Sequence, residues 1–210
     1  MYLLILFLKI SIFSVLLLIV SISKTHFILF KCINSCHTNN YMKRTVIIQG
    51  SSRSKGDTSL IVNYLADKYQ IDVIDLNTKT IGQYDYEYKN ANDDFMETIT
   101  EVIENYNTII FATPVYWYTM SGIMKAFFDR ISDVIRSHKD LGKQLRGKQM
   151  AMISTSNSDD LVKGFNMPFE ASANYLGMNY LGDTHTWVEN NHIPEIVKTK
   201  IDNFSSLLVP

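Results

Sequence analysis

The sequence predicts an α/β domain built on a doubly wound sheet of five parallel strands, in the order 2-1-3-4-5, with helices on both faces. Three observations support this prediction. Short apolar, β-branched segments alternate with longer segments whose apolar residues recur at helical spacing. The segment 108–113 (TIIFAT) is apolar on both faces, as expected of a central strand in a parallel sheet. Only 9 Gly and 4 Pro are present, too few for a disordered or fibrous chain.

The elements follow one another from residue 45 to residue 208. The first strand is a β-branched run that ends at a glycine, TVIIQG, and each later strand has a similar apolar character. The segments between them repeat apolar residues every three or four positions, which indicates helices. A tyrosine-rich segment without a clear period, 77–93, is predicted to be a long loop. The predicted strands are 45–50, 71–76, 108–113, 149–154 and 179–188, and the predicted helices are 58–69, 94–105, 120–137, 165–177 and 194–208.

The composition excludes several classes of protein. The 210 residues are 46% hydrophobic and 20% charged with a net charge of −1, whereas nucleic-acid-binding proteins usually have a basic excess. We therefore expect no nucleic-acid partner. Both cysteines, Cys32 and Cys36, lie within the first 41 residues. The main domain thus has no thiolate nucleophile and no disulfide framework, and we predict no metal site.

The first 41 residues are predicted to be an apolar extension that precedes a domain over residues 42–210. They carry Lys9, Lys24 and Lys31 and no acid, a net charge of +3 against −4 for the remainder. Residues 2–22 are long and apolar enough to cross a bilayer. They could be a membrane anchor, a signal peptide with a poor charged region, or an over-extended start of the chain. We expect a cytoplasmic domain, and membrane contact only if the segment is retained. If it is an anchor, the basic residues that follow it place the main domain in the cytoplasm.

Ligands of such sheets bind beyond the carboxyl ends of the strands, at the switch point between the first and third strands. Three predicted loops meet there, 50–59, 113–122 and 154–159. The first loop offers backbone N–H groups, hydroxyls and two cations at a helix N-terminus, which suits a phosphate monoester, although a plain polar turn is the alternative. It matches neither the P-loop nor the dinucleotide-binding glycine pattern.

The other two loops have different chemistry. The second carries the consecutive aromatic residues Tyr116, Trp117 and Tyr118, which cannot all point into one core. A flat aromatic cofactor would stack on such residues, but they could instead cover the end of the sheet or contact a second subunit. The third loop, STSNSD, could bind the polar edge of a heterocycle or be a solvated turn.

Taken together, these segments resemble the flavodoxin-like NAD(P)H-dependent oxidoreductases, the NADPH-dependent FMN reductase group. The resemblance rests on Gly50-Ser51-Ser52-Arg53 with Thr58 and on segment 113–130 (TPVYWYTMSGIMKAFFDR), and it covers roughly residues 43–205. It implies a flavodoxin-like fold and bound FMN, which would take a hydride from NADPH or NADH and reduce a quinone, flavin, nitro or azo compound. No side chain need then be catalytic. A flavodoxin-type electron carrier without small-molecule turnover is the alternative.

The resemblance also implies which residues hold the flavin. The phosphate would be bound by the first loop, and the two edges of the isoalloxazine ring would be bordered by the second and third loops. The predicted ligands are Ser51, Arg53 and Thr58 for the phosphate, Pro114, Val115, Tyr116 and Trp117 for the ring, and Thr155 and Ser156 for its other edge. Asp57 departs from the family, which often has Asn there. A carboxylate beside a phosphate is unfavourable unless it caps the helix or turns away.

Other residues are predicted to have structural roles. Lys125 and Asp129, four apart on a helix, should form an exposed ion pair. His185, near the end of the fifth strand, is predicted to be a surface or packing residue that could approach the site. We expect a homodimer, and the sequence offers one apolar helical stripe that belongs to the core first and to a dimer face second. The stripe consists of Met120, Met124, Phe127 and Phe128.

Overall fold

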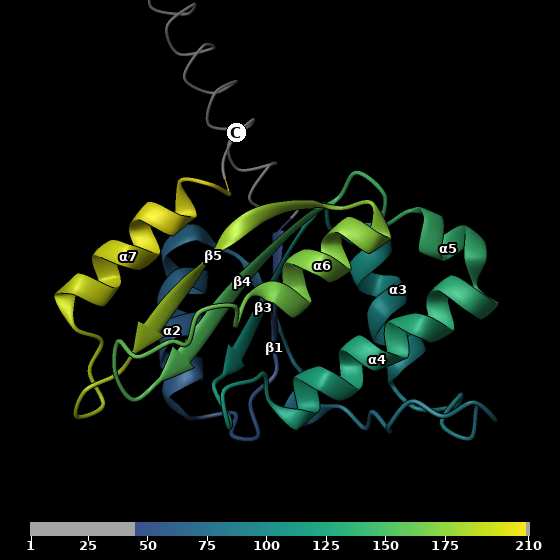
Figure 1. Ribbon diagram of the computed structural model, residues 1–210, viewed down its shortest axis with the longest axis horizontal. Coiled ribbons are helices and arrows are strands. Elements are labelled where there is room, and N and C mark those ends of the chain that lie inside the picture. Colours follow the sequence, from purple (N-terminus) through teal and green to yellow (C-terminus); the bar gives the residue numbers. More distant parts are fainter. Residues whose placement is uncertain (1–44, 209–210) are drawn as a thin grey trace, which may run out of the picture. The chain divides into compact units, whose positions relative to one another are not determined.

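A computed structural model describes residues 45–208, so the predictions for residues 1–41, including the apolar segment 2–22 and both cysteines, lie outside the described residues. Five parallel strands form one sheet in the order β2-β1-β3-β4-β5, as predicted (Figure 1). The strands are β1 (Thr45–Gln49), β2 (Asp72–Asp75), β3 (Thr108–Pro114), β4 (Gln149–Ser156) and β5 (Asn179–Trp187).

All five predicted helices are present, and their ends lie within three residues of the predicted ones. Two further short helical segments were not predicted, because neither is long enough to show an apolar period. The helices are α2 (Asp57–Tyr69), α3 (Phe95–Asn105), α4 (Gly122–Ser137), α5 (Lys139–Lys143), α6 (Met167–Leu176) and α7 (Glu195–Ser205), and η1 (Leu76–Thr78) is a 3-10 turn.

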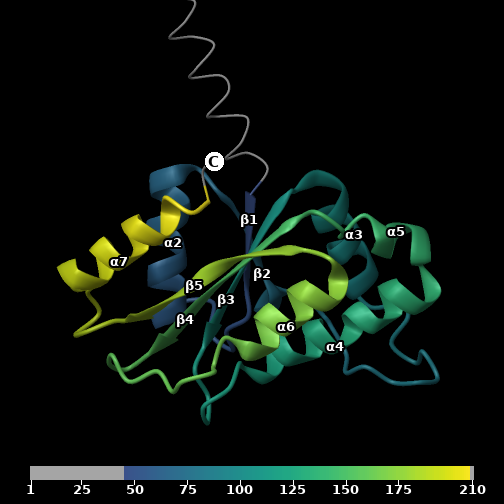
Figure 2. The ribbon, with the colours of Figure 1, turned by 45° about the horizontal axis from the view of Figure 1, so that its top comes forward.

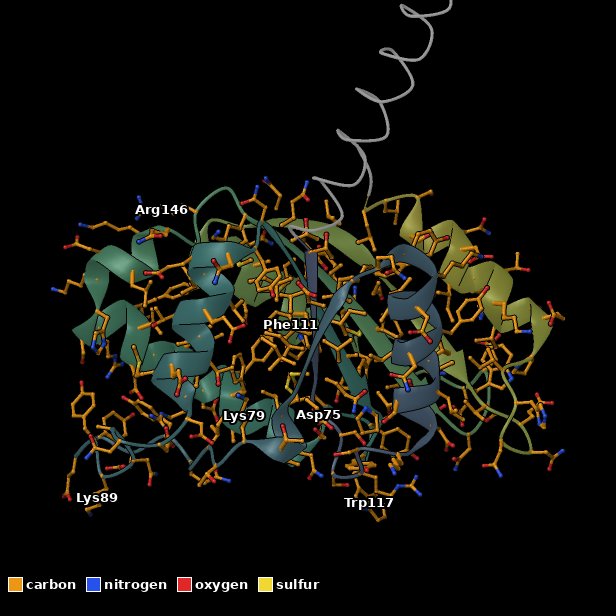
Figure 3. All side chains as sticks on the ribbon, turned by 180° about the vertical axis from the view of Figure 1, so that it is seen from behind. Asp75, Lys79, Lys89, Phe111, Trp117 and Arg146 are labelled. Atoms are coloured by element: carbon orange, nitrogen blue, oxygen red, sulfur yellow. The ribbon has the colours of Figure 1, made fainter. Side chains whose placement is uncertain are left out.

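The helices cover the two faces of the sheet unequally, as Figures 1 and 2 show. Helices α2 and α7 pack on one face, and α3, α4 and α6 pack on the other. Successive residues of β3 point to opposite faces, so Ile110 belongs to the first core and Phe111 to the second. Phe111 lies at the centre of the second core (Figure 3), with its ring 4.7 Å from that of Phe128 and 6.2 Å from that of Phe169.

The apolar stripe of α4 belongs to this second core. Met120, Met124 and Phe127 are at most 5% exposed, and Phe128 packs against the same cluster. The expectation of a core role is therefore confirmed. The second expectation, a dimer face, is wrong for this stripe, because its side chains are already covered within the chain. The predicted ion pair on the outer side of α4 is confirmed, with Lys125 Nζ 2.6 Å from Asp129 Oδ1.

The tyrosine-rich loop between η1 and α3 is fastened to α4 by one buried arginine. Arg130 is 2% exposed, and its guanidinium forms ion pairs with Asp93 at 2.6 Å and Asp133 at 2.5 Å. It also donates to the main-chain oxygens of Gly82 and Asn90 in the same loop. The sequence showed no period in this loop because tertiary contacts to a single side chain, rather than a regular helix or strand, define its course.

The charges of this cluster stabilise one another. Burial by itself would raise the pKa of Asp93, but hydrogen bonds from Arg130 and from the N–H groups of Gly82 and Phe95 outweigh it, so the pKa of Asp93 is lowered. Burial would likewise lower the pKa of Arg130, and its two carboxylate partners raise it instead. Asp93 and Arg130 are thus held in their charged form. Removal of the arginine would leave the two carboxylates without a neutralising cation.

We predict that Arg130→Ala lowers the free energy of unfolding by about 3–5 kcal/mol, because it leaves two carboxylates in the protein interior without their cation. Urea unfolding at pH 7 measures this, with the exposed Arg136→Ala as the matched control, for which we expect a change below about 1 kcal/mol. Since the pKa of Asp93 is lower in the folded protein, its stabilising contribution is present above the unfolded value near ~3.9 and is lost as the pH falls below it. A variant as stable as the control at pH 7 would contradict this role.

Candidate cofactor-binding site

Two of the three predicted loops are joined beneath the site by a buried serine. Ser121 is 1% exposed and is the N-cap of α4, where its hydroxyl accepts a hydrogen bond from the Met124 N–H and donates one to the Gly50 carbonyl. Its own N–H donates to the Thr113 hydroxyl at 3.0 Å. Because Gly50 follows β1 and Thr113 lies at the end of β3, this one residue fixes the start of α4 to both strands at the switch point.

The close approach of the helix requires a glycine after β1. A Cβ atom at Gly50 would lie 2.8 Å from Met124 Cβ, closer than side chains in proteins approach. The neighbouring loops are tied in a similar way, since the Val115 N–H donates to the Thr155 carbonyl at 2.8 Å. The positions of the three loops relative to one another are therefore set by buried backbone groups.

The first loop keeps several hydrogen-bond donors free. The side chains of Ser51 and Thr58 are 3% and 2% exposed, yet the Thr58 hydroxyl makes no hydrogen bond with residues 45–208. The Ser51 hydroxyl accepts a bond from the Arg53 N–H at 3.3 Å, which curls the loop. The backbone N–H groups without a partner in the described chain include those of Ser51, Ser52, Ser54 and Lys55. A loop of free donors at a helix N-terminus suits an anion.

The charges of this loop are unevenly neutralised. No carboxylate pairs with Arg53 or Lys55 in the part of the chain that the structure describes. The Arg53 guanidinium lies over Gly56, where a Cβ would be 3.2 Å from Nε. Asp57 begins α2, makes no capping hydrogen bond and lines the same cavity as Arg53. It neither caps the helix nor turns away, so it brings a negative charge to the place where the phosphate is predicted.

The second loop is a tight hairpin with an unusual tip. Tyr116 and Thr119 form two backbone hydrogen bonds, of 2.9 and 3.1 Å, around the two central residues Trp117 and Tyr118. Both central residues have positive φ, 49° and 63°, the pattern of a type I′ turn, in which Asn and Gly are preferred. A second hairpin in this chain has Asn190 and Asn191 at equivalent positions, with φ of 50° and 61°. The Trp-Tyr tip is therefore strained where the Asn-Asn tip is not.

The strained tip displays its aromatic rings to solvent. The side chains of Trp117 and Tyr118 are 92% and 69% exposed, so their burial within the chain does not offset the strain. Figure 3 shows Trp117 at the outer end of this loop. Tyr116, at the base of the hairpin, is held by a 3.0 Å hydrogen bond between its hydroxyl and that of Ser52 in the first loop. Backbone strain that local packing does not offset is typical of a functional segment.

The third loop continues β4 and is anchored on β5. Thr155 is 3% exposed, and its hydroxyl lies 3.0 Å from that of Thr186. The Ser154 and Ser156 hydroxyls lie 2.9 and 3.2 Å from the two ring nitrogens of His185. His185 does not line the cavity, and its ring contacts the loop instead, which agrees with the predicted packing role.

The three loops enclose one cavity of about 100 Å³. Eight of the nine predicted ligands line it, and the ninth, Trp117, lines an adjoining hollow of about 250 Å³. Two residues of the cavity, Asp57 and Asn157, were not among the predicted ligands. Asn157 carried no signal of its own in the sequence, since any polar residue suits such a turn. The lining consists of Ser51, Arg53, Asp57, Thr58, Pro114, Val115, Tyr116, Thr155, Ser156 and Asn157.

Residues 45–208 contain neither a metal-binding cluster nor a membrane-spanning helix. Within this range no group of three or more His, Cys, Asp or Glu side chains is placed to hold a metal ion. No helix in the same range is long and apolar enough to span a membrane.

Comparison with known proteins gives a family and a fold. The family model described as NADPH-dependent FMN reductase matches residues 43–192. A Bacillus subtilis protein named as an NAD(P)H-dependent FMN-containing oxidoreductase, YwqN, is 28% identical over 149 residues. The match covers 66% of this chain and 82% of that protein. An NADPH azoreductase of a Bacillus species is 25% identical over 96 residues, 46% of this chain and 54% of that protein. The solved Trp repressor binding protein of Bacillus subtilis has the same fold, with a TM-score of 0.62 and 24% identity over 78% of this chain and 97% of that one.

We predict that replacing Trp117-Tyr118 by Asn-Gly raises the free energy of unfolding by about 1–2 kcal/mol, because both positions then suit positive φ and little buried area is lost. Chemical unfolding without ligand measures this. The same replacement at Asn190-Asn191 is the matched control and should change stability by less than about 0.5 kcal/mol. A less stable Trp117-Tyr118 variant would show that packing of the rings outweighs the strain.

Proposed function

The chain belongs to the NADPH-dependent FMN reductase family, and from this premise we propose that it uses bound FMN to carry a hydride from NADPH or NADH to a small acceptor. Flavin oxidoreductase activity and an FMN cofactor with a nicotinamide donor follow from the family. The acceptor is the finer part of the proposal, and we place it among quinones, free flavins, nitro compounds and azo compounds. The name of the Bacillus azoreductase supports the last of these.

The observation that carries the proposal is the cavity where the loops after β1, β3 and β4 converge. Its residues fit a flavin mononucleotide. At one end an arginine without an ion-pair partner among the described residues, a nearly buried free hydroxyl and unpaired N–H groups match a phosphate. Beside it, the Pro114–Trp117 segment and the Thr155–Ser156 pair offer apolar surface and polar groups, as the two edges of a flavin require.

Within this proposal the flavin supplies the redox chemistry and the chain supplies binding and orientation. Arg53, Ser51 and Thr58 hold the phosphate, so the position of the ring is set by the first loop. Tyr116 connects that loop to the aromatic hairpin through its hydrogen bond to Ser52. Trp117 and Tyr118 stand at the open side of the adjoining hollow, where a planar donor or acceptor would stack. Orientation of two rings in this way lowers the barrier to hydride transfer.

Two further features belong to the proposal. We propose that the protein is a homodimer. The supporting surface consists of exposed apolar side chains near the cavity, those of Trp117, Tyr118 and Val162. Sedimentation equilibrium over a range of concentrations decides it, and a strictly monomeric protein would exclude it. The cytoplasmic location of the domain stays a prediction.

The proposal is tested by rapid mixing. We expect the purified full-length protein to be yellow, or to become so with added FMN, and to lose its flavin absorbance within one turnover when mixed anaerobically with NADPH or NADH. Reoxidation by a quinone or an azo dye should restore the absorbance. A protein that binds FMN and is reduced by neither nicotinamide would be an electron carrier, and a protein that binds no FMN would refute the proposal.

We predict opposite effects for the two charged residues of the first loop. Arg53→Ala should weaken FMN binding about 10- to 150-fold, since a charge-assisted contact to the phosphate is lost. Asp57→Asn should tighten it about 3- to 10-fold at low salt, since a nearby negative charge is removed. Asp67→Asn, the same charge change near the far end of α2, is the matched control and should have no effect.

Riboflavin, which lacks the phosphate, separates these effects from a general change of the site. Both variants should bind riboflavin as the wild type does, and the gain from Asp57→Asn should shrink as salt is added. Equal changes for FMN and riboflavin would move the phosphate away from this loop. Isothermal titration, or quenching of flavin fluorescence, measures both ligands.

A further inference from the structure

His185 is the one ionisable side chain that underlies the third loop from the neighbouring strand. In the register of the sheet it lies beside Ser154, and both of its ring nitrogens have partners. Nδ1 lies 2.9 Å from the Ser154 hydroxyl. Nε2 lies 2.9 Å from the main-chain carbonyl oxygen of Ser158 and 3.2 Å from the Ser156 hydroxyl. A ring that contacts three residues of one loop is well placed to fix its course.

The partners determine which nitrogen carries the proton. The Ser158 carbonyl oxygen can only accept a hydrogen bond, so Nε2 must be the donor there. In the neutral ring Nδ1 then accepts from the Ser154 hydroxyl. Ser154 is fully buried, and its hydroxyl has no other partner among the described residues. The neutral ring with its proton on Nε2 therefore satisfies every group in this arrangement.

The rest of the loop is held by further polar contacts. The Ser156 hydroxyl donates to the Asp160 carboxylate at 2.8 Å, and this bond and one from Ser158 lower the pKa of Asp160. Asp159 pairs with Lys200 of α7 at 2.9 Å. Lys200 in turn lies 4.6 Å from the centre of the Trp187 ring. The loop is thus attached to β5 through His185 and to α7 through Lys200.

This loop forms one wall of the proposed flavin site. Ser156 and Asn157 line both the cavity and the adjoining hollow, and Asp160 lines the hollow. His185 lines neither. A change at His185 can therefore reach the flavin only through the loop. It should do so at the ring end of the site, since the phosphate end is built from the first loop.

We propose that His185, as a neutral imidazole that donates from Nε2, is a positioning residue that holds segment 156–160 in place as the wall beside the flavin ring. The identity of the ligand, a flavin, rests on the proposed function. The contact between His185 and the loop does not. In this proposal the loop is held by a residue of the neighbouring strand β5 and not only by residues of the loop itself. The side chain touches no reacting atom, and its effect is on binding and orientation.

The test compares three substitutions in the full-length protein. His185→Phe keeps a planar ring and loses both hydrogen bonds. His185→Gln can keep the donation to the Ser158 carbonyl, and His185→Asn can keep only the contact to Ser154. We expect the Phe variant to bind FMN and riboflavin about tenfold more weakly, by the same factor for both. The Gln variant should stay within about threefold of the wild type, and the Asn variant should resemble Phe. His192→Phe, an exposed histidine of the neighbouring hairpin, is the matched control and should change nothing.

A second readout needs no flavin. Amide hydrogen exchange of residues 157–160 in the ligand-free protein should be faster in the Phe and Asn variants than in the wild type, and should be restored in the Gln variant. Unchanged exchange and unchanged binding in the Phe variant would overturn the inference, as would weakened binding of FMN that spares riboflavin. If the Phe variant does not fold, the order of Gln and Asn decides, and a Gln variant worse than Asn counts against it. A wild type that binds no flavin would refute the proposed function alone, and hydrogen exchange would still decide the role of His185.

Discussion

The hydroxyl of Ser121 is the constraint on which the site depends. It is a helix cap and a bond between two strand ends at once, because it accepts from α4 and donates to the carbonyl after β1. The absence of a side chain at Gly50 allows the helix to come close enough for this bond. Parallel strands bring their carboxyl ends to one edge of a sheet in any protein of this class. The serine adds a fixed distance between the phosphate loop and the aromatic hairpin, which a ligand spanning both requires.

The segment 113–130, on which the family resemblance rests, divides into two parts with different tasks. Its first part builds the cavity wall and the hairpin. Its last residue, Arg130, is buried, lines neither the cavity nor the adjoining hollow, and fastens the 77–93 loop by an ion pair and main-chain contacts. Residues that mark the family are thus partly ligands and partly supports. A motif alone does not distinguish the ligands from the supports. Burial together with fully satisfied hydrogen bonds identifies the supports.

The sequence was sufficient for the strands, the helices and the edge of the sheet where three loops meet, because these follow from apolar periodicity and from the rule that parallel strands place their loops at one edge. Most residues of the cavity were predicted from the family resemblance and not from these patterns. The sequence was insufficient for features that depend on contacts between distant residues. Trp117 and Tyr118 are not turn formers, so their positive φ left no trace in composition. The support of the third loop by His185 depends on the register between β4 and β5, which no local pattern reveals. The sequence assigned the α4 stripe to the core before a dimer face, and only the contacts of the folded chain decide between the two, because the pattern is the same whether a sheet or a second subunit covers it.

The strand order has a consequence for the synthesis of this protein on the ribosome. Strand β1 is completed first, yet it pairs with β3, which begins at Thr108, roughly 60 residues later. At about 5–20 residues per second, the ribosome leaves that edge of β1 open for about 3–12 s. The strand is an uncharged run of high β-propensity, TVIIQ, and such segments associate readily while unpaired. The hazard of aggregation during synthesis therefore resides in the most deeply buried strand of the finished protein and not in its exposed aromatic hairpin.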